Sequence, residues 1–308
     1  MSRLTGILAA TYTAMHQDGS VNLDMIDHQA HSLERNGLAG AFICGTTGEG
    51  VSLSTAERLK VAERWMAARG NLVVVVHVGH NSLEECKVLA AHAQKIGADA
   101  IAAISPTYLK PPRIEELVAF CAQVAAAAPD LPFYYYHIPS MTGVRFPVVE
   151  LMRAAAQHIP NLAGAKFSDD NLTELEGCVN LTLPGRQSLN MVMGHDEQLL
   201  SALRIGAQAA VGSTYNWMAP LYVRMVRAWR AGDQTAANAL QAQAGQIAGI
   251  VNRHGGLVAG KSVMSLIGLD CGPARLPLRS LTVQELAALR TELQQAGFFD
   301  VCSSDGEG

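Results

Sequence analysis

One lysine stands in an apolar, strand-like segment. Lys166 is the charged residue of the sequence GAKFS at 164–168, where its neighbours are small or apolar. An ammonium group in such a segment is costly unless it is paired with an acid or loses its proton. A neutral amine attacks carbonyl carbon, and apolar burial favours the neutral form. The segment therefore predicts an amine nucleophile, with a strand-end lysine paired to Asp169 as the alternative.

A tyrosine-rich segment provides a candidate proton-transfer group. It reads YYYH at 134–137, and side chains alternate between the two faces of a strand, so Tyr134 and Tyr136 share one face. A phenol near an amine nucleophile can carry a proton to or from a reacting oxygen. Tyr136 is our candidate for that role. Packing of the rings in the core, with their hydroxyls hydrogen-bonded, is the alternative.

A glycine-rich turn follows another apolar segment. Residues 45–50 read GTTGEG, so the glycines have the spacing G-x-x-G-x-G and not the G-x-G-x-x-G of dinucleotide-binding loops. The turn offers the hydroxyls of Thr46 and Thr47 and exposed backbone N–H groups. These donors suit a carboxylate or another small anion. A plain strand-to-helix turn is the alternative.

Two further patterns predict no site. Residues 255–262, GGLVAGKS, formally match the G-x-x-x-x-G-K-[ST] phosphate loop, but that loop must follow a buried strand. Here the match follows the helical pattern of 241–253, so we expect no nucleotide binding. The histidines show no H-E-x-x-H or comparable spacing, and we therefore predict no metal site.

The candidate residues belong to a regular alternation of two kinds of segment. Apolar, β-rich runs alternate with Ala-, Leu- and Glu-rich helical patterns. Continuous apolar character is typical of strands that are buried on both faces. Eight such strands predict an α/β fold, a TIM (β/α)₈ barrel, in preference to an open doubly wound sheet. The predicted strands are 6–13, 40–45, 72–79, 100–105, 132–139, 164–168, 189–194 and 209–213.

The barrel predicts where the candidate residues stand. Reactive groups of a TIM barrel lie where strands end and the following loops begin. In chain order, those positions hold residues 45–50, Tyr136 and His137, Lys166, residues 194–197 and Ser213.

Helix signals lie between the strands and continue after them. The capping-box pattern Ser/Thr-x-x-Glu begins at Ser54, Ser82 and Thr282. After residue 215 the strand signals cease, and the chain is predicted to be helical throughout as far as residue 298. We expect a barrel core at 1–215, a C-terminal helical extension of the same domain at 216–298, and a polar tail at 299–308.

The composition excludes several classes of protein. With 49% hydrophobic and 16% charged residues, the 308-residue chain can form a buried core, unlike a disordered chain. A formal net charge of −4 and scattered Lys and Arg provide no basic surface for nucleic acid or an anionic membrane. No apolar run could cross a bilayer and no secretory signal is seen, so we expect a cytoplasmic protein. The six cysteines, without a C-x-x-C pair, are predicted to be free thiols.

Taken together, the motifs resemble the dihydrodipicolinate synthase/N-acetylneuraminate lyase superfamily over residues 6–278. They appear in the family's order and spacing: GTTGEG at 45–50, YHIP at 136–139, GAK at 164–166 and GSTYN at 212–216. The resemblance implies a Schiff-base aldolase in which Lys166 forms the imine and Tyr136 is the catalytic tyrosine. It also implies that no metal or organic cofactor takes part, because the lysine imine is the electron sink.

The resemblance also implies how the keto acid and the sugar are bound. Thr46 and Thr47, with their backbone amides, are expected to hold the carboxylate of pyruvate, and Thr47 is counted among the catalytic residues as well. Asp196 and Glu197 are expected to accept hydrogen bonds from sugar hydroxyls, since a carboxylate can accept several at once.

Four further positions follow from the same resemblance. Ser168, Gly194 and Ser213 are expected to line the cleft that binds the substrate. Tyr108 stands where some family members lend a tyrosine across a subunit interface. A homotetramer is the assembly that the family implies.

The lyase branch of the superfamily, in particular its animal members, resembles the chain most. Residues 133–139, 166–169 and 196–203 carry this likeness. In the synthase branch an arginine binds the carboxylate of the second substrate, but this chain has Met141, which cannot pair with an anion. An uncharged amino sugar fits better. We therefore expect cleavage of N-acetylneuraminate to N-acetylmannosamine and pyruvate.

Two alternatives stay open. The first is another pyruvate-dependent aldolase or hydratase of the superfamily that acts on a different 2-keto acid. His195 departs from the residue types expected at its position, which leaves the sugar specificity open. The second is a barrel that binds a keto acid without turnover, and the presence of both Lys166 and Tyr136 argues against it.

Overall fold

The computed structural model describes residues 3–303, and its strands form a closed parallel barrel in the order β1 to β8. The predicted TIM barrel is thus confirmed. Almost every strand residue is buried, which is why the strands read as continuous apolar runs. The strands are β1 Gly6–Ala10, β2 Gly40–Ile43, β3 Val73–His77, β4 Ala100–Ala103, β5 Phe133–His137, β6 Leu162–Phe167, β7 Asn190–Met193 and β8 Ala209–Gly212.

Helices follow the strands, and their starts agree with the capping patterns. Both Ser54 and Thr282 form complete capping boxes, and the Ser82 hydroxyl accepts a hydrogen bond from the backbone N–H of Glu85. The helices are α1 Met25–Arg35, α2 Thr55–Ala68, α3 Leu83–Lys95, α4 Ile114–Ala126, α5 Pro139–Thr142, α6 Val148–His158, α7 Leu172–Val179, α8 Leu199–Ile205, α9 Tyr215–Arg230, α10 Gln234–Arg253, α11 Leu257–Leu266 and α12 Val283–Gln295. Short 3₁₀ turns are η1 Gly50–Ser52, η2 Asp196–Gln198 and η3 Phe298–Asp300.

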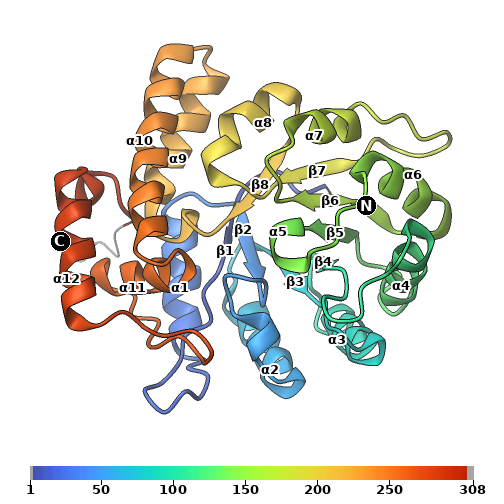
Figure 1. Ribbon diagram of the computed structural model, residues 1–308, viewed down its shortest axis with the longest axis horizontal. Coiled ribbons are helices and arrows are strands. Elements are labelled where there is room, and N and C mark those ends of the chain that lie inside the picture. The colour runs from blue at the N-terminus through green and yellow to red at the C-terminus, as the bar shows by residue number, and fades with distance from the viewer. Residues whose placement is uncertain (1–2, 304–308) are drawn as a thin grey trace. The chain divides into compact units, whose positions relative to one another are not determined.

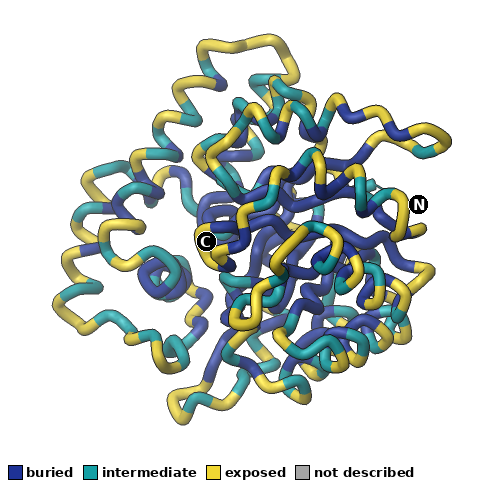
Figure 2. The backbone as a smooth tube through the Cα atoms, turned by 45° about the vertical axis from the view of Figure 1, so that its right-hand side comes forward, coloured by how far each residue is buried: buried dark blue, intermediate teal, exposed yellow. Residues whose placement is uncertain are grey.

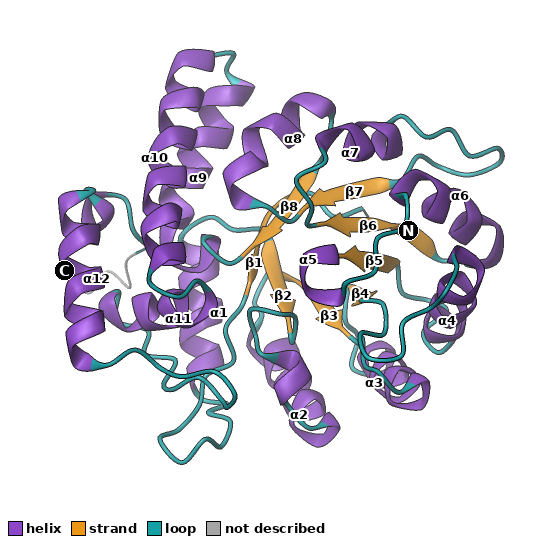
Figure 3. Cartoon of the chain, viewed as in Figure 1, coloured by secondary structure: helices purple, strands orange, loops and turns teal. Residues whose placement is uncertain are grey.

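The chain divides into two compact units. The first unit is the chain up to Gly6 together with Val74–Val211, and the second is Ile7–Val73 together with the chain from Gly212. In the first unit, α3, α4 and α6 lie outside the strands β4 to β6 (Figure 3). Figure 2 shows the resulting pattern, with buried strands and helices that are exposed on their outer sides.

The second unit holds the C-terminal helices. In Figure 1, α9 and α10 run side by side in orange, and these two helices make extensive contact. The chain was predicted to be helical throughout 216–298, but residues 268–282 form a non-helical connection between α11 and α12. Pro273 and Pro277 lie in this stretch, and proline lacks the backbone N–H that a helix needs. The prediction of continuous helix was therefore wrong here.

Strand bounds differ from the predicted ones by a few residues. The first strand was expected to reach Thr13 but ends at Ala10, and beyond this end the Thr13 hydroxyl donates to the carbonyl of Gly48 at 2.7 Å. Strand β6 begins at Leu162, two residues before the predicted start. Residues 304–308 of the predicted polar tail lie outside the described residues.

Two further sequence predictions concern the whole chain. All six cysteines are free thiols, as predicted, and five of them are buried. Burial raises the pKa of the Cys44 thiol to about 11 and that of Cys121 to about 12, so these thiols stay protonated. Within residues 3–303 the structure has no helix that is both long and apolar enough to cross a membrane.

Candidate active site

Sheet pairing places the candidate nucleophile beside the candidate proton carrier. Tyr136 of β5 and Lys166 of β6 are direct partners in the parallel register. The Lys166 amine lies over the Tyr136 ring, with Nζ 3.7 Å from the ring centroid. The two residues are 5% and 3% exposed, so the amine is desolvated in the way that a neutral lysine nucleophile needs.

Ser168 lies beside the amine, and Gly194 lies against Ser168. Lys166 Nζ lies 3.4 Å from Ser168 Oγ, in a hydrogen bond from amine to hydroxyl. A Cβ atom at position 194 would lie only 1.9 Å from that same Oγ. The Gly194 backbone N–H donates to the carbonyl of Phe167 at 2.7 Å, which fixes this close approach. Glycine is therefore required at 194 so that the Ser168 hydroxyl can stay beside the lysine.

His77 is a neighbour of Tyr136 that the sequence reasoning missed. It is the last residue of β3, is 2% exposed, and meets the Tyr136 ring edge-on with 5.9 Å between centroids. The rule that found Tyr136, a polar residue at the end of an apolar strand, also applies to VVVVH at 73–77. That signal could have found it.

The other aromatic residues of β5 belong to the core. Tyr134 donates from its hydroxyl to Asn190 Oδ1 at 2.7 Å, and burial raises its pKa to about 12. Burial also raises the pKa of Tyr135. These two rings match the packing alternative, in which the hydroxyl of a buried tyrosine is hydrogen-bonded or stays protonated.

His137, on the opposite face of β5 from Tyr136, faces an acid that was the alternative partner of Lys166. Its Nε2 is 3.8 Å from Asp169 Oδ2, and its ring stacks on Phe167 with 5.4 Å between centroids. Burial lowers the pKa of His137, while the Asp169 carboxylate acts in the opposite direction. Asp169 also accepts the backbone N–H of Asn171 at 3.0 Å.

The segment after β7 carries the predicted sugar-binding acids. Asp196 is buried at the start of η2, whereas Glu197 is exposed. Between Gly194 and these acids, His195 Nδ1 lies 2.9 Å from Asp170 Oδ1, and Gln198 donates to the same oxygen at 3.2 Å. The unexpected histidine is thus tied to the loop after β6.

Tyr108 lies apart from this cluster. It belongs to the loop after β4 and is 86% exposed. Its backbone N–H and that of Thr107 donate to Asn81 Oδ1, which holds the loop in place. Its neighbour Leu109 is 82% exposed. The loop therefore presents large apolar side chains to solvent in the single chain.

The predicted anion-binding turn belongs to the second unit. Thr46 and Thr47 are half-buried, and Glu49 and Gly50, which follow them, are buried. The Glu49 backbone N–H donates to the Thr46 carbonyl at 3.0 Å, and that of Gly50 donates to the Gly45 carbonyl at 3.0 Å. The segment is therefore a compact turn with a fixed course.

Ser213 follows β8 and also belongs to the second unit. It is half-buried, and its carbonyl accepts from Asn216 Nδ2 at 2.8 Å. The same Asn216 amide donates to the Ala10 carbonyl at 2.7 Å. Asn216 of the GSTYN motif thus ties the start of α9 to the end of β1.

The comparisons with known proteins identify the family of this chain. Residues 3–296 match the model of the dihydrodipicolinate synthetase family. The chain belongs to this family. The match covers all the predicted site residues, from Thr46 to Ser213.

Relatives of this family member share nearly their full length with it. It is 43% identical to N-acetylneuraminate lyase from Gallus gallus over 298 residues, which are 95% of this chain and 96% of that lyase. It is 40% identical to N-acetylneuraminate lyase from Homo sapiens over 96% of this chain and 93% of that protein. The solved structure of Proteus mirabilis N-acetylneuraminate lyase superposes with a TM-score of 0.92 at 37% identity, covering 96% of this chain and 100% of that one.

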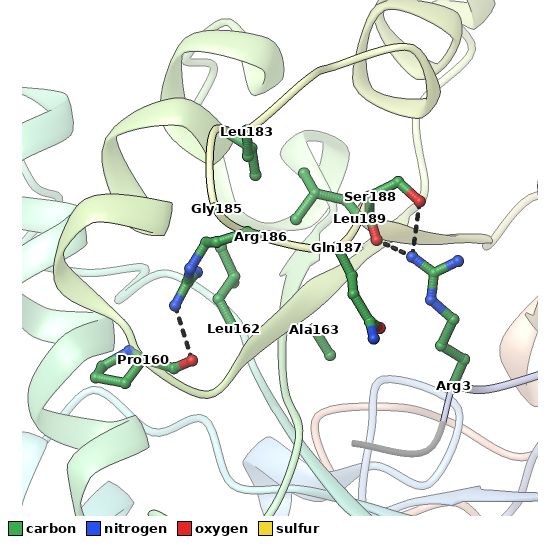
Figure 4. A pocket seen from close by; sticks show the side chains of 10 residues that line it. All are labelled: Arg3, Pro160, Leu162, Ala163, Leu183, Gly185, Arg186, Gln187, Ser188 and Leu189. Atoms are coloured by element: carbon green, nitrogen blue, oxygen red, sulfur yellow. Dashed lines mark hydrogen bonds between the residues drawn. The ribbon is translucent and has the colours of Figure 1, made fainter.

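A surface pocket of this family member lies at the other ends of the strands. It has a volume of about 280 Å³, and Figure 4 shows Arg3 and Arg186 on two sides of it. Leu162 begins β6 and Leu189 directly precedes β7, so the pocket opens at the amino ends of these strands. Catalysis in TIM barrels occurs at the carboxyl ends. We assign no catalytic role to this pocket.

No metal site is found among residues 3–303, where no three His, Cys, Asp or Glu side chains gather in a way that could hold an ion. The groups that can react at this site are the Lys166 amine, the Tyr136 phenol and the Ser168 hydroxyl. An amine, a phenol and a hydroxyl at van der Waals distance can form an imine and move protons around it.

Proposed function

We propose that this chain is a Schiff-base (class I) aldolase, an N-acetylneuraminate lyase that cleaves N-acetylneuraminate to N-acetylmannosamine and pyruvate. The observation that carries the proposal is the buried Lys166 amine over the Tyr136 ring, 3.7 Å from its centroid. Relatives that share 40% and 43% of their residues with the chain over almost its whole length are named N-acetylneuraminate lyase. They make this carbon–carbon lyase activity the best-supported one.

The first step of the proposed mechanism forms the covalent intermediate. The neutral Lys166 amine attacks the C2 ketone of the open-chain sugar acid, and loss of water gives a protonated imine. The imine then accepts the electron pair of the C3–C4 bond as that bond breaks, which leaves an enamine. This lysine imine supplies the electron sink, and we propose that the enzyme needs no metal or organic cofactor.

Tyr136 moves the proton that bond cleavage requires. As the phenolate, it accepts the proton of the C4 hydroxyl while the C3–C4 bond breaks and the aldehyde form of N-acetylmannosamine leaves. The enamine is then protonated at C3, and water hydrolyses the imine to release pyruvate and the free lysine. Ser168, in hydrogen-bond contact with Nζ, is placed to orient the amine.

The remaining site residues bind the two halves of the substrate in this proposal. Thr46 and Thr47 hold the pyruvate carboxylate through hydroxyls and backbone amides, and Thr47 thereby also counts as catalytic. Asp196 and Glu197 accept hydrogen bonds from sugar hydroxyls. Gly194 and Ser213 line the cleft.

The family supports a proposal about the assembly. We propose a homotetramer in which Tyr108 meets a neighbouring subunit. The exposure of Tyr108 and Leu109, 86% and 82%, supports this, because large exposed apolar side chains often mark interfaces. We propose further that the protein is cytoplasmic and that residues 216–298 extend the barrel domain.

One observation favours a second candidate, a related aldolase for a different 2-keto acid. His195, beside the predicted sugar-binding acids, is paired with Asp170 at 2.9 Å. A histidine held by a carboxylate offers its other ring nitrogen to a polar substituent, so the preferred sugar acid can differ from N-acetylneuraminate.

The test is pyruvate release by the purified chain, coupled to a pyruvate-consuming dehydrogenase. N-acetylneuraminate is compared with a panel of other 2-keto sugar acids at equal concentration. We expect the fastest release from N-acetylneuraminate. Faster release from another member of the panel would select the second candidate, and no release from any substrate would leave a barrel that binds without turnover.

A further inference from the structure

Glu49, two residues after Thr47, is buried in an unusual backbone conformation. Its φ and ψ are 53° and 30°, in the left-handed region, and its side chain is 1% exposed. A non-glycine residue is unfavourable in this region, because its Cβ lies too close to the following carbonyl oxygen. A buried carboxylate is also unfavourable unless it is paired. Glu49 must therefore make interactions that offset both effects.

The partners of Glu49 come from the far end of the sequence. Lys261 of α11 donates from Nζ to Glu49 Oε1 at 2.7 Å, and its side chain is 2% exposed. The backbone N–H of Arg275 donates to Glu49 Oε2 at 2.7 Å. Lys261 donates in addition to the carbonyl of Pro273 at 2.7 Å. Both carboxylate oxygens are thus hydrogen-bonded, and the two buried charges balance.

Lys261 is the lysine of the phosphate-loop pattern GGLVAGKS. The structure places it inside α11, after α10, with no strand directly before it. Its ammonium donates hydrogen bonds to the carboxylate of Glu49 and the carbonyl of Pro273. The pattern therefore marks the anchor of another loop and not a nucleotide site.

The turn that Glu49 anchors has little freedom of its own. Thr13 donates from its hydroxyl to the Gly48 carbonyl at 2.7 Å. A Cβ atom at Gly48 would lie 3.0 Å from the Thr11 carbonyl oxygen, and one at Gly50 would lie 1.9 Å from that of Cys44. The turn is therefore held by its contacts with Thr11, Thr13 and Cys44 and by the hydrogen bonds of Glu49.

Arg275 extends the anchor to the start of α2. Its guanidinium makes two hydrogen bonds to the carboxylate of Glu57, at 2.9 and 2.8 Å, and also donates to the carbonyls of Ser52 and Gly19. These bonds to Arg275 hold the pKa of Glu57 at about 2. The chain that leaves the turn is therefore tied to one arginine.

From this arrangement we infer that Glu49 and Lys261 are positioning residues for the carboxylate of the keto acid. They fix the backbone of the turn so that the N–H groups and hydroxyls of Thr46 and Thr47 hold one arrangement before the substrate arrives. The inference rests on the proposed function, which gives Thr46 and Thr47 the carboxylate. The hydrogen bonds of the pair join Glu49 and Lys261 to each other and to backbone groups, so we expect its loss to weaken carboxylate binding and to leave the Lys166 chemistry intact.

The test measures covalent trapping of the full chain by borohydride with two ketones. Pyruvate carries the carboxylate, and methyl pyruvate is the matched ketone without the charge. For Glu49→Gln we expect the half-saturating pyruvate concentration to rise roughly tenfold to a hundredfold, as misplaced binding groups do. Two quantities should change by less than about twofold: the trapping rate at saturating pyruvate and the half-saturating concentration of methyl pyruvate. The reason is that the variant loses binding of the carboxylate, which is equally strong before and during the reaction.

A double variant separates positioning from stability. Removal of one member of a buried pair leaves an uncompensated charge that can prevent folding, whereas removal of both often does not. We therefore include Glu49→Gln/Lys261→Met, which should fold and still show the raised half-saturation for pyruvate alone. The control is Glu292→Gln, which breaks an exposed pair with Arg253 and should leave both ketones unchanged.

Two results would overturn the inference. One is equal loss of trapping with both ketones, and the other is wild-type half-saturation in the double variant, since each would give the pair a purely structural role. Failure of the proposed function has a different signature. Wild-type chain that is trapped by pyruvate but does not cleave N-acetylneuraminate would refute the lyase activity and leave this comparison of variants fully readable.

Discussion

The Lys166 cluster and the turn at 45–50 are rigid for different reasons. Lys166 and Tyr136 are held by strand register, with the Ser168 hydroxyl beside Lys166 and the His77 ring against Tyr136. The turn is held by the buried ion pair of Glu49 with Lys261 and by the bond of Glu49 to Arg275. Lys261 and Arg275 lie 212 and 226 positions after Glu49 in the sequence. The first region places an amine over an aromatic ring, while the second gives each oxygen of a buried carboxylate a hydrogen-bond donor.

This difference indicates that the two regions have separate roles, one in the chemistry and one in binding. A nucleophilic lysine needs few polar partners, because strong pairing would favour its charged form. A loop that binds an anion needs fixed donors, because mobile ones would have to be ordered during binding. Substitutions in the first region should therefore change the chemistry, and those in the second should change binding or stability.

The largest expected effect is that of Lys166→Ala. Loss of the nucleophile should lower pyruvate release by at least about 10⁴-fold, the scale seen when a covalent nucleophile is removed. The fold should persist, because the substitution takes a charge-bearing group out of a buried position. Steady-state cleavage rates and thermal unfolding measure both effects. Lys60→Ala, at an exposed position of α2, is the control and should keep wild-type turnover.

Tyr136→Phe should have the next largest effect. Without the phenol, cleavage should fall by about 10²- to 10⁴-fold, the usual contribution of a positioned proton-transfer group. Imine trapping with pyruvate should persist, because the amine is intact. The matched control is Tyr134→Phe on the same face of β5, which loses a bond to Asn190 and should cost about 1 kcal/mol of stability with little change in turnover. Equal loss of cleavage in both variants would contradict the role of Tyr136.

Gly194→Ala tests the close approach at Ser168. The added Cβ would meet Ser168 Oγ at 1.9 Å, so the hydroxyl must move away from the lysine. We expect kcat/KM to fall by roughly tenfold to a hundredfold, as for displacements of about 1 Å near a reacting group. Gly245→Ala is the comparison, because it lies in α10 with nothing within 4 Å of the added Cβ. That variant should gain about 1 kcal/mol of stability and keep its activity.

The smallest expected effect is a pH dependence in the second region. The pKa of Glu57 is lowered to about 2 from its ordinary value of 4.5, chiefly by Arg275. The bond therefore stabilises the fold fully above pH 4.5, and this contribution is lost as the pH falls toward 2. Compared with Glu57→Gln, the wild type should be more stable by about 1 kcal/mol at pH 7, since solvent screens the pair.

Chemical unfolding at several pH values checks that expectation. The difference in unfolding free energy between wild type and Glu57→Gln should shrink steadily below pH 4.5. A difference that stayed constant down to pH 2 would show that the carboxylate makes no charge-dependent contribution.

The sequence predicted the first region far better than the second. Lys166 and Tyr136 were visible because each stands in a short apolar strand, and a barrel brings strand ends together. The eight strands were likewise visible, since strands buried on both faces read as apolar runs. The ends of the strands were predicted less well, because residues 11–13, beyond the end of β1, are buried like the strand itself.

The anchor of the turn could not be predicted in the same way. Lys261 drew attention only through a phosphate-loop pattern, and nothing local reveals that its partner is Glu49. The non-helical stretch that supplies Arg275 was also missed, although Pro273 and Pro277 were present as signals. Contacts between residues distant in sequence depend on the assembled fold, which single-sequence patterns do not encode.

The most direct test of the central claim is borohydride trapping of the wild-type chain with pyruvate, followed by peptide mass spectrometry. The account predicts one reduced adduct, on the peptide that contains Lys166, and none in Lys166→Ala. An adduct on another lysine, or none on the wild type, would contradict the claim that Lys166 forms the imine.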